Sequence, residues 1–505
     1  PTIGSLATKI LKTLLPTEGI PKLLNTTIYN ASKKANRGGY SGPIERLYYK
    51  ADNNKKIYKV DITSLYPSSC DYNPLYEKWW TEFPNPKNGW HFEEPNTEFE
   101  MPMLNNKHGL YYIQYDQSHL NTEGKYAPIL QNVESPKAKS LTRIGIGEGW
   151  YSTSAIRYFK DMGVMINLVK GYYTPFTYNP FKKYMDTFKA RKNNADKDKK
   201  KELGKPYSER NIDFLNKCEY DRTFSKLMLN SLIGRLNMNA ERQQTLLTES
   251  YNDCISLMGN PFVECNTPEI CETSDGKYFY SMTYKEDDLK YQLGNLDIAP
   301  YMSAFVLDYS KILMAENFRK IKELGGTLLY TDTDSVAFIG TPAMYNEYSG
   351  QFCLKTNIAE KFAVSQKTFG YMELEGVYDY YCSVGPKKYI VQVDNEYYEY
   401  RANGVGAKCN MKVPIQERFE KLIFDKKAIE VNSFSIKCEK GISKLVHTYK
   451  GTKMINPLFF KGRIYDTVKV NMWDDELEFY NHTKEFYENK VEYDTLYLQT
   501  TEYAH

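Results

Sequence analysis

Residues 328–340 read LLYTDTDSVAFIG. Two apolar runs flank a short polar centre that holds two aspartates, Asp332 and Asp334. The runs have the composition of β-strands, and the centre is typical of the turn that joins two strands in a hairpin. Aspartate, threonine and serine bond to their own backbone in turns, so turn chemistry alone would explain both aspartates. The alternative is a metal site, which requires a third carboxylate from elsewhere in the chain.

A candidate for this third carboxylate lies in the stretch IYKVDITSLYPSSC at residues 57–70. Residues 57–62 have the composition of a strand, and Asp61 lies inside it. A carboxylate is costly to bury in a strand unless it is paired or binds a cation. If this strand neighbours the hairpin in one sheet, three carboxylates meet at one sheet end and offer the oxygen ligands that suit Mg²⁺. Two such ions about 3.5–4 Å apart assist an in-line phosphoryl displacement.

The segment EYDRTFSKLMLNSLIGRLNMN at residues 219–239 is a predicted helix. Arg222, Lys226 and Asn230 recur at every fourth position, so they share one face of this helix. Gly234 ends the polar stripe and permits the close approach of a backbone or a base. A solvated helix face is the ordinary explanation for such residues. Because apolar neighbours confine them to a narrow stripe, we favour a role in binding a triphosphate.

Composition limits the classes of protein that fit. A chain of 505 residues predicts two to four domains or subdomains. The net charge is only +3, so a nucleic-acid partner would have to bind local basic patches. The nine cysteines form no CxxC pair, which argues against a disulfide framework or a zinc ribbon and favours a reducing intracellular compartment. No apolar run is long enough to span a membrane, and we expect no membrane partner.

The pattern along the chain predicts an α+β fold in successive segments. Residues 1–50 form a lead-in, in which an amphipathic, acid-poor helix ends at Pro16. This opening is either a mitochondrial presequence or a surface helix, and we favour the surface helix. Short strands dominate 51–180, helices 181–240 and polar turn residues 241–294. A long amphipathic helix at 295–326 opens the segment 295–410, and 411–505 is a mixed helical tail.

One basic run within the helical segment, ARKNNADKDKKKELGK, covers Ala190 to Lys205. We interpret it as a solvated helix tip or loop. The functional alternative is a tip that contacts phosphates.

Taken together, these segments resemble the family B DNA polymerases. DITSLYPS at 61–68 resembles the first palm motif of that family, and YTDTDS at 330–335 resembles the second almost letter for letter. RTFSKLMLNSLIG at 222–234 resembles the fingers-helix motif, and GPKKYIV at 385–391 resembles the KxY motif that grips the primer strand. The protein-primed branch of bacteriophage, adenovirus-like and linear-plasmid polymerases is the closest fit, because Tyr40-Ser41-Gly42 stands where that branch carries its template-binding YxGG motif.

The resemblance implies a right-hand polymerase fold with an antiparallel palm sheet, helical fingers and a thumb. The palm would cover 51–180, with a first insertion, and 295–410. The fingers would cover 181–240, a second insertion 241–294, and the thumb 411–505. In that branch the insertions grip the terminal protein and enclose DNA.

The resemblance also assigns roles to individual residues. The catalytic carboxylates would be Asp61, Asp332 and Asp334, and the metal ligands Asp61, Asp334 and the carbonyl of Ile62. Tyr66 would lie under the incoming sugar and exclude a ribose 2′-hydroxyl. The residues expected to contact the incoming nucleotide are Ser64, Leu65, Tyr66, Arg222, Lys226 and Asn230. The residues expected to contact DNA are Tyr40, Gly42, Ser231, Gly234, Thr333, Lys387, Tyr389 and Arg401.

The chain departs from the family pattern at several positions. Ile233 replaces the usual tyrosine of the fingers motif, Pro43 replaces the second glycine of YxGG, and Arg401 and Asn403 stand where lysine is usual. The DxE motif of the branch's exonuclease is absent before Asp61. It recurs at 394–396, a predicted hairpin turn, and at 474–476, a predicted solvated acidic face. We therefore expect the exonuclease to lie upstream of Pro1.

Two other functions compete with a template-directed DNA polymerase. A reverse transcriptase or RNA polymerase would favour a YxDD turn and a smaller residue at Tyr66. An inactive relative that only binds DNA or a priming protein would have lost an aspartate. We expect a monomeric enzyme that uses deoxynucleotides, template and primer, two Mg²⁺ ions with Mn²⁺ as a substitute, and a terminal protein. It would replicate a linear plasmid, in mitochondria, or a viral genome, in the cytoplasm of the host.

Overall fold

The fold is that of a computed structural model. It describes residues 2–15, 20, 25–45, 48–52, 54–122, 125–135, 138–143, 145–241, 244–272, 276–286, 293, 297–353, 369–393, 397–402, 429–438 and 446–455. Among the helices in these ranges, none combines the length and the apolar character that crossing a bilayer requires.

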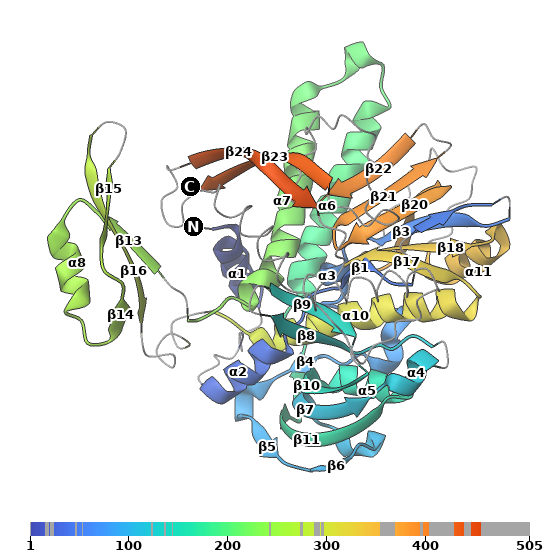
Figure 1. The fold of residues 1–505 in the computed structure, drawn as a ribbon, viewed down its shortest axis with the longest axis horizontal. Helices are drawn as coiled ribbons and strands as arrows, with labels where there is room; N and C mark the ends of the chain where they lie inside the picture. The colour runs from blue at the N-terminus through green and yellow to red at the C-terminus, as the bar shows by residue number, and fades with distance from the viewer. Residues whose placement is uncertain are drawn as a thin grey trace.

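A five-stranded antiparallel sheet, here called the central sheet, contains the predicted hairpin (Figure 1). Its strands, in spatial order, are β1 (Ser41–Pro43), β17 (Thr327–Asp332), β18 (Ser335–Gly340), β3 (Lys56–Ile62) and β19 (Met372–Tyr378). The predicted hairpin is the pair β17–β18, and its neighbour β3 carries Asp61, as the sequence predicted. All six residues of β18 are buried, because other elements cover both faces of the sheet.

Helix α10 (Pro300–Glu323) lies against one face of this sheet. It begins later than expected, at a proline in its first turn, and ends before Gly325, whose φ of +80° favours glycine. The expected amphipathic pattern is wrong for most of its length. The helix is buried nearly all round because α2 (Thr26–Ala35), α5 (Thr153–Asp161) and α7 (Ile212–Leu236) also pack against it. Helix α11 (Pro342–Phe352) contacts it as well and stacks Tyr345 on Tyr58 of β3.

A second sheet covers the opposite face. Its strands, in spatial order, are β2 (Tyr48–Lys50), β20 (Tyr380–Gly385), β21 (Lys388–Val393) and β22 (Tyr397–Ala402). Buried side chains of both sheets, Leu329 and Tyr381 among them, form a shared apolar cluster.

The first insertion follows the short helix α3 (Leu65–Ser68) and is built around a sheet of order β10-β7-β11-β5. Its helical segments are η1 (Pro74–Trp79), η2 (Pro86–Asn88), η3 (Met101–Leu104), α4 (Ser118–Thr122) and α5. Its strands are β4 (Phe83–Pro84), β5 (His91–Glu93), β6 (Thr97–Glu98), β7 (His108–Asp116), β8 (Leu130–Ser135), β9 (Ala138–Arg143), β10 (Ile146–Ser152), β11 (Met165–Thr174) and β12 (Thr177–Tyr178).

Two long helices, α6 (Lys182–Leu203) and α7, make up most of the segment predicted as the fingers and run side by side beyond the sheets (Figure 1). The basic run begun at Ala190 continues α6 to its end, and the turn η4 (Tyr207–Glu209) joins the two helices. The opening helix α1 (Ile3–Leu14) packs against α7 through buried Ala7 and Leu11, as expected of an amphipathic helix.

The second insertion forms a small unit whose elements pack against one another. Strand β16 (Tyr278–Glu286) pairs with β13 (Gln244–Thr248), β14 (Val263–Cys265) and β15 (Glu269–Glu272), and α8 (Tyr251–Met258) packs against this sheet. Both figures show the unit set apart from the rest. In the expected thumb, the described segments β23 (Ile429–Cys438) and β24 (Val446–Ile455) form a hairpin, so the helical prediction is wrong there. Both DxE repeats lie outside the described residues.

Candidate active site

A strained turn fixes the position of Asp334. Thr333 has φ +72°, which is rare for a β-branched residue, and the Asp334 amide donates to the Asp332 carbonyl at 2.8 Å, as in a γ-turn. The Thr333 amide donates to the Tyr40 carbonyl at 2.9 Å. Gly39 makes this approach possible, because a Cβ there would lie 2.6 Å from Cγ2 of Thr333. The γ-turn and the tertiary contacts of Thr333 with residues 39–40 therefore hold Asp334 in place.

Strand register brings Asp61 to the same place. Asp61 is the partner of Ser335, the residue directly after Asp334, and the Ile62 amide donates to the Asp334 carbonyl at 2.7 Å. Ile62 itself ends β3 with its side chain buried. Two carboxylates that are far apart in the chain thus meet at one end of the sheet.

Burial and neighbouring negative charges raise the pKa of both carboxylates. Burial, and then the negative charge of Asp334, raises the pKa of Asp61 to about 7. Burial, and then the charge of Asp332, raises the pKa of Asp334. Neither carboxylate has an ion-pair partner among the described residues, and two adjacent hard oxygen donors of this kind fit a divalent cation.

Asp332 is arranged differently from the other two. Nζ of Lys387 lies 2.9 Å and 3.2 Å from its carboxylate oxygens. In the part of the chain that the structure describes, no group of three or more His, Cys, Asp or Glu side chains is arranged to hold a metal ion. The structure therefore brings two of the three expected carboxylates together and pairs the third with a lysine.

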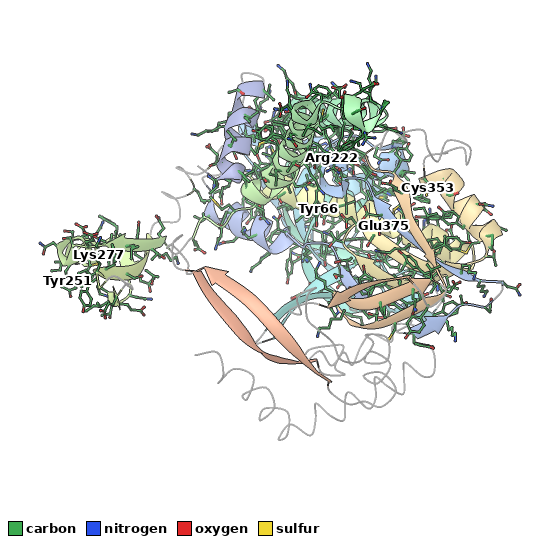
Figure 2. The ribbon with its side chains drawn as sticks, turned by 90° about the horizontal axis from the view of Figure 1, so that it is seen from above. Tyr66, Arg222, Tyr251, Lys277, Cys353 and Glu375 are labelled. Atoms are coloured by element: carbon green, nitrogen blue, oxygen red, sulfur yellow. The ribbon has the colours of Figure 1, made fainter. Side chains whose placement is uncertain are left out.

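Tyr66 lies close to Asp334. Burial raises the pKa of the Tyr66 phenol, the backbone of Gly39 opposes this rise through a hydrogen bond, and the charge of Asp334 adds to it. The helix that carries Tyr66 begins after Ser64, whose φ of +57° reverses the chain, and Leu65 next to it is buried. This helix contacts α7, the helix that carries Arg222, and Figure 2 labels both Tyr66 and Arg222.

The fingers stripe is exposed at three of its four positions. Lys226, Asn230 and Gly234 are exposed, and no atom would contact a Cβ at Gly234 within 4 Å. Arg222 instead pairs with Asp196 of α6, with 2.9 Å between Nε and Oδ1, and with Glu219. Its predicted contact with a triphosphate would require this pair to open.

The neighbours of that stripe are less accessible. Ser231 is partly buried, and Ile233 is buried in the apolar core. Ile233, which replaces the usual tyrosine of the fingers motif, therefore does not lie on the exposed stripe.

Sequence reasoning missed two lysines of α6 beside the catalytic sheet. Nζ of Lys192 and Nζ of Lys189 lie 4.8 Å and 5.1 Å from the centre of the Phe369 ring, and Lys192 is buried. The next residue, Gly370, donates its amide to the Thr63 carbonyl at 3.0 Å, so both amines lie beside the loop after Asp61. Their spacing of three on a predicted helix was the available signal.

Two glutamates of β19 were missed as well. Glu373 is the register partner of Asp61, and a bulge at Glu375 interrupts the pairing of β19 with β3. Nζ of Lys59 lies 2.8 Å from Glu375, and the charge of Glu375 contributes to the raised pKa of both Asp61 and Asp334. The alternation of acidic and other residues in MELEG was the available signal.

The residues of the KxY motif contact the same hairpin. Lys387, with φ +55°, donates its amide to the hydroxyl of Tyr330, and the rings of Tyr330 and Tyr389 are 4.6 Å apart. Together with its ion pair to Asp332, this ties the KxY motif to the second palm motif. The backbone of Arg401 lies in β22, and Asn403 lies outside the described residues.

Residues 41–43, at the position of the YxGG motif, form the edge strand of the sheet. Tyr40 donates its hydroxyl to the Pro43 carbonyl at 2.9 Å, and β1 pairs Gly42 with Thr331. Pro43 occupies an edge strand, where the missing amide is tolerated.

Residues 1–324 match the family model described as DNA polymerase type B, organellar and viral. The chain belongs to this polymerase family. Probable DNA polymerases of Podospora anserina and Neurospora intermedia are relatives. The first is 26% identical over 479 residues, 88% of this chain and 34% of the relative. The second is 24% identical over 396 residues, 77% of this chain and 34% of the relative. The chain thus spans about a third of the length of these curated relatives.

Solved structures of the phi29 DNA polymerase share the fold. Its complex with primer-template DNA and incoming nucleotide matches with a TM-score of 0.55 at 16% identity, covering 90% of this chain and 68% of that chain. Its orthorhombic crystal form matches with a TM-score of 0.55 at 15% identity, over the same shares. The predictions of a family B polymerase and of a right-hand fold are confirmed.

Proposed function

We propose that this chain is a template-directed DNA polymerase that adds deoxynucleotides to a 3′ hydroxyl. The observation that carries the proposal is the pairing of β3 with β18, which leaves Asp61 and Asp334 adjacent and, among the described residues, without an ion-pair partner. Family membership supports the same reaction class.

Asp61 and Asp334 would hold Mg²⁺, or Mn²⁺ in its place, because adjacent carboxylates are ligands that such hard cations prefer. When bound, two ions would supply the charge neutralisation that phosphoryl transfer requires. The chain's own residues bind and orient the reactants. Lys226 and Asn230 would hold the triphosphate from the exposed face of α7. Lys192 of α6 lies beside the loop that follows Asp61.

Tyr66 would limit the space under the sugar, since its ring is partly buried next to Asp334. Lys387 and Tyr389 would steady the primer end, because their contacts with Tyr330 and Asp332 couple them to the catalytic turn.

A second part of the proposal is how replication begins and where in the cell it takes place. We propose protein-primed replication of a linear plasmid or viral genome, by a monomer that uses a terminal protein. Tyr40-Ser41-Gly42 at the sheet edge and the two insertions support this. The corresponding location is the mitochondrion for a plasmid and the host cytoplasm for a virus.

Primer extension tests the core proposal. The assay compares the parent chain, Asp334→Asn and the matched control Asp253→Asn, which changes an exposed aspartate of the second insertion. Parent and control should extend a DNA primer with Mg²⁺ and four deoxynucleotides, whereas Asp334→Asn should lose most extension and keep its affinity for DNA. Equal extension by Asp334→Asn would refute the catalytic role, and an equal loss of DNA binding would make the carboxylate structural. Extension only from a protein primer would support the finer proposal.

A further inference from the structure

The far end of the fingers carries a basic surface that the proposed chemistry does not use. Two ion pairs set the register of the antiparallel helices: Asp196 with Arg222, and Lys199 with Glu219 at 2.6 Å. By this register, Lys201 lies level with Lys217, and the hairpin continues beyond them to its turn. We call residues 197–217 the fingers tip.

Basic residues outnumber acidic residues on this stretch. Residues 190–217 contain nine basic and five acidic residues, an excess larger than the net charge of +3 of the whole chain. Within the described residues, the acids Asp196, Glu202 and Glu219 already have basic partners. The remaining lysines of the tip have no ion-pair partner there: Lys197, Lys200, Lys201 and Lys217.

An exposed aromatic ring lies in the turn η4 between the two helices. Tyr207 is 81% exposed, the highest value among the large hydrophobic side chains that the structure describes. The guanidinium of Arg210 lies 5.7 Å from the centre of its ring, and its Nε donates to the Lys205 carbonyl, which fixes that group. One face of the ring is therefore supported by a cation, and the side chain is otherwise open to solvent. Such a ring beside basic residues is the arrangement on which unpaired bases stack.

We infer that the fingers tip binds single-stranded DNA, with lysines on the phosphates and a base on Tyr207. This inference rests on the proposed function in one respect: the strand would be the unpaired template next to the active site. From Arg222 to the level of Leu203 is roughly 10 Å along the helices, at 1.5 Å per residue. At about 3.4 Å per base step, a strand that follows α7 reaches the tip within about three nucleotides.

The second insertion also carries an exposed tyrosine next to a lysine, but most of its charged residues are acidic. Between residues 244 and 286 it has seven acidic residues and two lysines. Tyr278 is 57% exposed there and follows Lys277, which lies on the unit set apart in Figure 2. An exposed tyrosine beside a lysine is thus present in an acidic setting that repels phosphates. Lys277→Ala and Tyr278→Ala are therefore matched controls for the tip.

The test is binding of a labelled single-stranded oligodeoxythymidine to the full chain, followed by fluorescence anisotropy over a range of salt concentrations, without metal or nucleotide. Replacing Lys200 and Lys201 together by alanine should reduce the slope of log affinity against log salt by about 1.4, at about 0.7 per phosphate contact. Tyr207→Ala should weaken binding about fivefold or more and leave the slope almost unchanged, because stacking is not ionic. Both control variants should bind as the parent does.

Three results would overturn the inference. One is parental affinity and slope in the tip variants, and another is an equal loss in the controls. The third is an equal loss of affinity for a blunt duplex, which would remove the preference for single strands. Lys201 and Tyr207 are exposed and Lys200 is partly exposed, so unchanged thermal unfolding should accompany every variant. Binding is measured without catalysis, so the two proposals can fail separately. A parent chain that binds DNA through the tip but extends no primer would refute the proposed function and leave the inference about the tip intact.

Discussion

Replacing Asp61 by asparagine should stabilise the metal-free protein while removing its activity. Burial and the neighbouring charge of Asp334 raise the pKa of the Asp61 carboxyl from 3.8 to about 7. A rise of this size corresponds to about 4 kcal/mol against the ionised form in the folded chain. Since the carboxylate is partly exposed, solvent screening reduces this penalty, and we expect about 2 kcal/mol.

The direction in which stability changes with pH follows from the pKa of Asp61 in the folded and in the unfolded chain. Below pH 3.8 the carboxyl is protonated in both the folded and the unfolded chain, and the penalty is absent. As the pH rises, the unfolded chain releases its proton first, so the penalty grows and is complete above about pH 7. Stability contributed by this group therefore falls with rising pH, and Asp61→Asn should remove the fall.

Urea unfolding in a chelator, near pH 5 and near pH 8, measures the effect. Asp61→Asn should exceed the parent by about 2 kcal/mol near pH 8 and by less than about 1 kcal/mol near pH 5. Asp332→Asn is the control, because Lys387 already compensates that carboxylate, and it should give no gain. At a Mg²⁺ concentration of about 100 times the dissociation constant, the parent should gain about 2.7 kcal/mol and overtake the variant. A variant no more stable than the parent near pH 8, or equal stabilisation of both by Mg²⁺, would refute the reasoning.

Other substitutions test the surroundings of the pair. Tyr66→Val should relax the rejection of ribonucleotides, measured as the ratio of kcat/KM for the two sugars, and an unchanged ratio would contradict its place under the sugar. Gly39→Ala should displace the turn by pressing on Thr333, with about 1–3 kcal/mol lost in urea unfolding and at least tenfold slower extension. Thr333→Gly in the same chain should restore part of both losses, unless the contact is unimportant. Lys387→Met should raise the primer concentration for half-maximal extension about fivefold, through loss of its ion pair with Asp332, with a smaller change at saturation.

The sequence predicted the elements whose signal is local. Apolar runs around Asp332 and Asp334 indicated the hairpin, and a carboxylate inside a strand indicated the partner Asp61, because burial makes such a residue costly without a function. Periodicity indicated α7 and its exposed stripe from Lys226 to Gly234. These patterns need no knowledge of distant residues.

What the sequence did not predict depends on tertiary contacts. The γ-turn at Thr333 requires the carbonyl of Tyr40, and the pairing of Arg222 depends on an aspartate of another helix. Helix α10 has polar positions that suggested a solvent-facing side, yet packing on several sides buries some of them, including Asp308 and Asn317. Local propensity carries no information about such neighbours.

The order of strands in the central sheet has a consequence for synthesis of the chain. Strand β3 ends at Ile62, and its partner β18 begins only at Ser335. At about 5–20 residues per second, the nascent strand waits roughly 15 to 55 seconds for its partner. An unpaired apolar strand invites edge-to-edge aggregation during such an interval. In KIYKVDI, the two lysines and Asp61 oppose that association. The carboxylate that destabilises the folded sheet therefore also protects the unpaired strand from aggregation during synthesis.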